Sequence, residues 1–156
     1  YTTLFRSPIG LARLLLERGG RPGRKRARAI LDAEYRATAV RLARLDALGS
    51  SRSTVVGRSS PLVPEWWLKT RELLMTVARR AGDSTTFRAI AEEVYRRTDR
   101  RDDLIRYAKT LEHGLRDYHG AIGEIESWSE RYAWDEELLH RFRRLKRKAR
   151  LYDGPV

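Results

Sequence analysis

The chain has 156 residues, with 33 lysines and arginines against 21 aspartates and glutamates, a formal net charge of +12 and no cysteine. The lack of cysteine excludes disulfides, iron–sulfur clusters and thiolate zinc sites, and a reducing cytoplasm is the expected location. No segment approaches the roughly 20 consecutive apolar residues of a membrane span, so we expect a soluble protein with no membrane partner.

The positive charge is concentrated at the two ends of the chain. The net charge is +9 over residues 1–60, −3 over residues 61–139 and +6 over residues 140–156. Of the basic residues, 28 are arginines, a bias that a GC-rich genome produces without selection for binding. The distribution of charge is therefore more informative than its sum, and it favours a polyanionic partner contacted by the ends.

The first seven residues, YTTLFRS, are the in-frame translation of what looks like the end of a common short-read sequencing adapter. We interpret residues 1–7 as an artefact and exclude them from reasoning about the fold. Residues 8–156 are then expected to form a single helical domain that is truncated at its N-terminus.

Apolar residues spaced four and three apart predict helices along the rest of the chain. A short helix from about Pro8 to Glu17 precedes a turn rich in glycine. Because this spacing favours nearly antiparallel packing, we expect an all-α antiparallel bundle of five or six helices with a long coiled-coil-like C-terminal hairpin. The apolar stripes are Leu31, Tyr35, Thr38, Leu42, Leu45; Trp67, Thr70, Leu74, Val77, Ala81; Phe87, Ile90, Ala91, Val94; Leu104, Ala108, Leu111, Leu115, Tyr118, Ile122, Ile125, Tyr132; and Leu138, Phe142, Leu145, Ala149, Tyr152.

Residues that end or cap helices predict the boundaries between these helices. Glycine, serine and proline mark residues 49–65 as an internal linker. Gly82 is a helix stop, and Asp135 lies near the N-cap of the last helix. We expect the helix over residues 102–132 to be continuous despite its three internal glycines, and Trp128 and Trp134 to fill the ends of the bundle.

The first basic cluster lies in the segment RGGRPGRKRAR, residues 18–28. Gly20, Arg21 and Pro22 resemble the Gly-Arg-Pro core of the AT-hook family, which implies an extended backbone whose arginines enter the minor groove of A·T tracts. Non-specific contact with phosphates, or a solvated basic turn, explains the same residues. The cluster consists of Arg21, Arg24, Lys25, Arg26 and Arg28.

The second basic cluster lies in HRFRRLKRKAR, residues 140–150. Cations near a helix C-terminus stabilise the helix dipole, but seven in eleven residues exceed that need. The pattern suits a helix that tracks a phosphate backbone, and acidic residues from the middle of the chain are the alternative partners. The cluster consists of Arg141, Arg143, Arg144, Lys146, Arg147, Lys148 and Arg150.

Other functional patterns are weaker. Residues 85–111 permit a helix-turn-helix unit that presents Arg101, Arg106 and Lys109, although Tyr95 is large for the turn. Of the adjacent tryptophans, Trp67 fits the apolar stripe, which leaves Trp66 as a possible partner contact.

No catalytic constellation, metal site or cofactor motif can be assigned. His113 and His119 lack a third clustered ligand, and no phosphate-binding G-x-x-x-x-G-K-S/T loop exists. We therefore expect a protein that binds DNA or RNA, mainly through phosphate contacts made by both basic clusters. The alternative is a structural or scaffolding bundle that binds another protein or self-associates.

Overall fold

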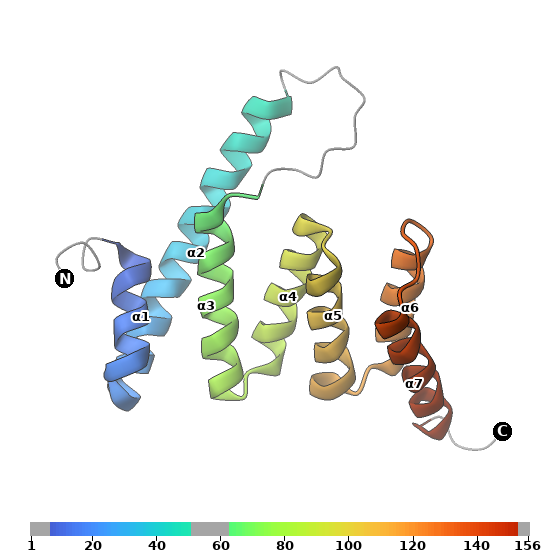
Figure 1. Ribbon diagram of the computed structural model, residues 1–156. Helices are drawn as coiled ribbons and strands as arrows, with labels where there is room; N and C mark the ends of the chain where they lie inside the picture. Colours follow the sequence, from blue (N-terminus) through green and yellow to red (C-terminus); the bar gives the residue numbers. More distant parts are fainter. Residues whose placement is uncertain (1–6, 51–62, 153–156) are drawn as a thin grey trace. The chain divides into compact units, whose positions relative to one another are not determined.

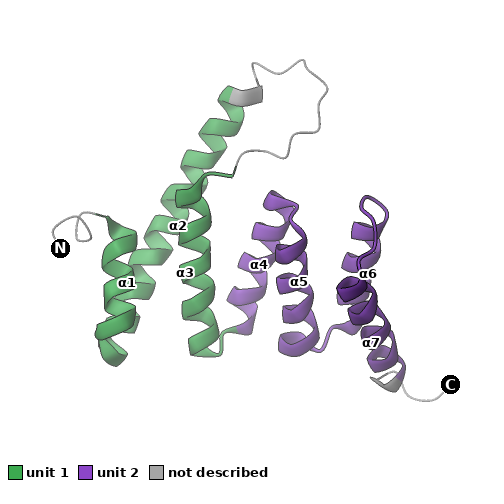
Figure 2. Ribbon diagram, viewed as in Figure 1, with its two compact units in different colours: residues 1–83 green, residues 84–156 purple. Residues whose placement is uncertain are grey.

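Every regular element in the described part of the chain is helical. The computed structural model describes residues 7–50 and 63–152, and these hold seven α-helices (Figure 1). The all-helical class is confirmed, whereas five or six helices were expected. The described helices belong to two compact units, Tyr1–Asp83 and Ser84–Val156 (Figure 2). A single domain packed as one antiparallel bundle stays a prediction, and residues 1–6 of the predicted artefact and 51–62 of the predicted linker lie outside the described residues.

The first unit contains α1 (Pro8–Arg18), α2 (Gly20–Ser50) and α3 (Glu65–Ala81), and each of these helices contacts the other two. The side chain of Ser7 caps α1 by accepting a hydrogen bond of 3.0 Å from the backbone N–H of Gly10. At the other end of the unit, Gly82 has a φ of 70° and ends α3, as predicted. Because α2 begins at Gly20, the extended backbone implied by the AT-hook resemblance is absent from residues 20–28.

Two glycines allow α1 and α2 to meet after a single connecting residue. A Cβ atom on Gly23 would lie 2.8 Å from the carbonyl oxygen of Leu15, and one on Gly19 would lie 2.6 Å from the Cα of Gly23. Gly20 adopts a φ of 54°, a backbone conformation that residues other than glycine rarely adopt. The glycine-rich segment therefore forms a tight helix–helix corner, not an open basic turn.

The long helix α2 has a buried half and an exposed half. At 31 residues it spans about 46 Å, against about 26 Å for the 17 residues of α3. Leu31 and Thr38, in the part of the helix up to residue 38, are fully buried. Val40, Leu45 and Leu48 are 54%, 49% and 69% exposed, and this second half runs past both neighbours in Figure 1. The predicted stripe is thus buried only along the part of α2 that lies beside α1 and α3.

A charged side chain fills the centre of the first unit. Arg71 is fully buried, and its guanidinium carbon lies 4.4 Å and 4.1 Å from the ring centroids of Tyr35 and Trp67. Its Nη1 donates a hydrogen bond of 2.7 Å to the hydroxyl of Thr38. Cation–π contacts and this hydrogen bond compensate for part of the cost of removing the charge from water.

The second unit contains α4 (Ser84–Thr98), α5 (Arg101–Thr110), a π-helical turn (Leu111–Leu115), α6 (Tyr118–Ser129) and α7 (Glu136–Tyr152). Its buried residues include Ile90, Val94, Leu104 and Ile125. Asp135 caps α7 as predicted, since its carboxylate accepts a hydrogen bond of 2.9 Å from the N–H of Leu138.

The expectation of a continuous helix over residues 102–132 is wrong. The helix ends after the π-helical turn, where Arg116 adopts a left-handed φ of 56°. The carbonyl of Leu111 accepts hydrogen bonds from the N–H groups of Arg116 and Asp117, so the C-terminus of this helix is capped. Asp117 then caps α6 by accepting a 2.8 Å hydrogen bond from the N–H of Gly120.

We expect Gly23→Ala to lower the free energy of unfolding by about 1–3 kcal/mol, because its Cβ would overlap the carbonyl of Leu15 at the α1–α2 corner. Urea denaturation followed by circular dichroism measures this change. Gly123→Ala is the matched control, since a Cβ there meets nothing within 4 Å, and it should raise stability by about 0.5–1 kcal/mol. An equal effect of both substitutions would contradict the close approach of α1 and α2.

Candidate nucleic-acid interface

The second basic cluster lies on α7, which has three faces of different character. Leu138, Leu145 and Ala149 are buried and form the face directed into the second unit. Two rows of cations flank this apolar face. We define the inner row as Arg141, Arg144 and Lys148, and the outer row as Arg143, Lys146, Arg147 and Arg150.

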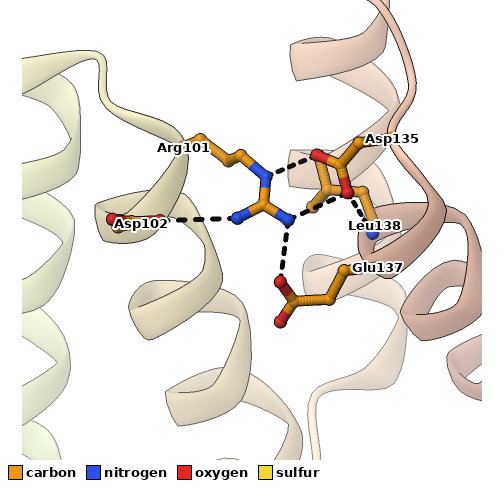
Figure 3. Close-up of polar contacts among 5 residues, drawn as sticks. All are labelled: Arg101, Asp102, Asp135, Glu137 and Leu138. Atoms are coloured by element: carbon orange, nitrogen blue, oxygen red, sulfur yellow. Dashed lines mark hydrogen bonds and ion pairs between the residues drawn. The ribbon is translucent and has the colours of Figure 1, made fainter.

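Arg101 of α5 fixes the beginning of α7 (Figure 3). Its Nη2 donates hydrogen bonds of 2.9 Å to Asp135 and 2.7 Å to Glu137, and its Nε also donates to Asp135. The hydrogen bonds from Arg101, together with the N–H of Leu138, lower the pKa of Asp135 to about 2. The hydrogen bonds to Asp135 and Glu137 raise the pKa of Arg101. Both groups are therefore charged at neutral pH, and they hold the N-terminus of α7 against α5.

All three cations of the inner row contact one buried carboxylate within the unit. Glu112 lies in the π-helical turn with its side chain inaccessible to solvent. It accepts hydrogen bonds of 2.5 Å from Arg144 and 2.7 Å from Lys148, and Arg141 contacts it at 3.4 Å. Arg141 is only 9% exposed.

The charge state of Glu112 follows from these partners. Burial raises the pKa of Glu112, but the hydrogen bonds from Lys148 and Arg144 and the nearby charge of Arg144 together lower it by more than burial raises it. Its pKa therefore lies below the ordinary value and the carboxylate is ionised. Burial and the neighbouring charge of Arg144 lower the pKa of Arg141. The inner row is therefore engaged within the unit, because all three of its cations contact Glu112.

The outer row faces solvent. Its four residues are exposed, and their spacing of three, one and three places them on one side of the helix. Lys146 lies 3.6 Å from Glu126, and both of these side chains are half exposed. Within residues 7–50 and 63–152 we find no ion pair for Arg143, Arg147 or Arg150.

The first basic cluster lies on α2, in the first unit. Arg21, Arg24, Lys25 and Arg26 are exposed. Arg28 is half-buried and pairs with Asp32 at 3.0 Å and with Asp83 at 3.6 Å. Arg21, Arg24 and Lys25 share one side of α2, so this cluster also presents an exposed cationic row.

The contacts of α5 argue against the helix-turn-helix alternative, because two of its three cations are paired with carboxylates. Arg101 is engaged by α7, and Arg106 contacts Asp103 at 3.5 Å. The three cations of this alternative line an open hollow of about 340 Å³ together with two carboxylates, which would repel phosphate; its lining is Arg101, Asp102, Ile105, Arg106, Lys109 and Glu137.

The tryptophans differ from one another in exposure. Trp67 is buried, as expected, and Trp66 is half-buried, so its role as a partner contact stays a prediction. Trp128 is buried, but Trp134 is 41% exposed and does not fill the end of a bundle. The sequence did not predict this exposure. Trp134 was expected to pack as part of a helical bundle, but α7 begins only at Glu136, so position 134 lies outside the helix.

Comparisons with protein-family models, with curated proteins and with solved structures find no match to this chain. Among the described residues, no group of three or more histidine, aspartate or glutamate side chains is arranged to hold a metal ion. No described helix combines the length and apolar character needed to cross a bilayer.

We expect Glu112→Gln to lower the free energy of unfolding by about 2 kcal/mol, because it leaves the inner row without a compensating charge. Partial exposure of Arg144 and Lys148 keeps the loss below that of a fully buried pair. Glu126→Gln is the matched control, since it removes an exposed ion pair worth about 0.5 kcal/mol or less. Chemical denaturation that gives equal losses for the two variants would contradict the structural role of Glu112.

Proposed function

We propose that this protein binds DNA or RNA through contacts with the phosphate backbone, made mainly by the outer row of α7. The observation that carries the proposal is the division of cations on this helix. The three cations of one row are bound to Glu112, whereas the other row is exposed on a helix that Arg101 holds in place. Cations that the protein does not neutralise internally attract a polyanion most strongly.

The dimensions of the outer row suit this partner. Residues 143 and 150 are separated by about 10 Å along the helix axis. The same length of duplex carries roughly six phosphate charges, so a row of four cations meets a comparable density of negative charge. The exposed row of Arg21, Arg24 and Lys25 on α2 is a second phosphate-contacting surface in this proposal.

We expect the variant Arg143→Gln/Arg147→Gln/Arg150→Gln to bind nucleic acid more weakly and with a lower salt dependence. Each lost phosphate contact reduces the slope of log affinity against log salt by about 0.9, so three contacts reduce it by about 2.7. Fluorescence anisotropy with labelled duplex and single-stranded oligonucleotides, titrated between about 50 and about 200 mM salt, measures the slope.

The matched control removes three exposed arginines outside both rows, with Arg79→Gln/Arg80→Gln/Arg100→Gln. This variant has the same net charge as the outer-row variant and should keep most of the slope. Equal losses in the two variants would mean that net charge alone attracts the polyanion. Absence of binding by the unmodified protein at either salt concentration would overturn the proposal.

A second candidate function is self-association through the exposed half of α2. Leu42 and Leu45 continue the stripe that is buried earlier in the helix, and two copies of α2 would cover one another there. An antiparallel pair centred on Leu45 sets Leu42 opposite Leu48 of the other copy. Apolar residues of the two identical helices would thus cover one another.

We expect this contact to give a weak dimer, because the exposed apolar side chains are few compared with the roughly 800 Å² per partner of a stable interface. Sedimentation velocity should show mass increasing between about 10 and about 500 µM protein. Leu45→Glu should abolish the increase, whereas Ala33→Glu, on an exposed position of the first half, should leave it unchanged. A monomer at both concentrations would exclude this second function.

A further inference from the structure

An exposed aromatic side chain lies beside the outer row. The rings of Trp134 and Phe142 have centroids 5.0 Å apart with an interplanar angle of 58°. Lys146, a member of the outer row, places its ammonium 4.4 Å from the centroid of the Phe142 ring. Trp134, Phe142 and Lys146 therefore form a continuous surface that leads from an aromatic ring to the cations of the row.

The segment that carries Trp134 is held on both sides. Asp135 is bound to Arg101 and caps α7. On the other side, the hydroxyl of Tyr132 donates to Asp99, and the Tyr132 ring lies 4.2 Å from that of Trp128. The indole is thus presented to solvent from a fixed stretch of chain, which reduces the conformational entropy lost when a ligand stacks on it.

We infer that the substrate class of this site is single-stranded nucleic acid, with one base stacked on Trp134 and the adjoining phosphates on the outer row. This inference rests on the proposed function and narrows it. In a duplex the faces of the bases are covered by their neighbours, so Trp134 would have nothing to stack on. In a single strand the faces are accessible, and an aromatic ring beside a cationic track is the combination that binds them.

The discriminating experiment compares three fluorescent probes of equal length: a single-stranded oligothymidylate, a duplex, and a base-free strand of deoxyribose phosphates. Trp134→Ala should lower affinity for the oligothymidylate on the order of 5- to 100-fold, the loss of stacking by one base. Affinity for the duplex and for the base-free strand should not change, because neither offers an accessible base. Trp134→Phe should restore most of the lost affinity.

Leu115→Ala is the matched control, because it truncates an apolar side chain of the same unit that is 38% exposed but has no ring on which a base could stack, and it should leave binding of all three probes unchanged. Thermal unfolding followed by circular dichroism checks that each variant folds. The Trp134→Phe variant keeps an aromatic ring at this position and tests the inference even if Trp134→Ala is unstable.

The outcomes separate this inference from the function on which it rests. Equal affinity of Trp134→Ala and the unmodified protein for oligothymidylate would overturn the inference, as would an equal loss for all three probes. If the outer-row variant still loses affinity in those cases, phosphate binding stands without base stacking. Failure of the unmodified protein to bind any probe would overturn both.

Discussion

The buried carboxylate of Glu112 is the interaction on which the arrangement of α7 depends. The seven cations within eleven residues of α7 repel one another, and they are too many to lie on a single face of the helix. Glu112 binds three of these cations on one side of α7, next to the buried apolar face of the helix. The remaining cations then face solvent. Pairing with Glu112 therefore separates the cations that hold the helix in the unit from those on its exposed side.

Local signals in the sequence predicted local structure well. Gly82 and Asp135 end and begin helices because capping depends on the residue itself and its next few neighbours. The break after the π-helical turn was missed, since Arg116 has no intrinsic preference for a left-handed backbone. It is held there by hydrogen bonds to the carbonyl of Leu111. Hydrogen bonding around the whole turn outweighed the preference of one residue.

The candidate site was predicted in composition but not in arrangement. The sequence locates the cations of α7, but it does not show that Glu112 pairs with residues 29 to 36 positions later. Such pairing is decided by packing between α7 and the π-helical turn, which is invisible to periodicity. The exposure of Trp134 was likewise not predictable from periodicity. Trp134 lies four residues before Leu138, a spacing that fits a helical stripe, but the helix begins only at Glu136.

Arg71 has a structural role that the high arginine content of this chain does not reveal. At most exposed positions an arginine is exchangeable with lysine, because solvent screens either charge and neither is held in a fixed geometry. At Arg71 a flat, weakly hydrated guanidinium lies over two aromatic rings, a place that the compact, strongly hydrated ammonium of lysine does not fit. Among relatives of this chain with a lysine-rich composition, the arginine at this position should therefore be retained while arginines at exposed positions are replaced by lysine.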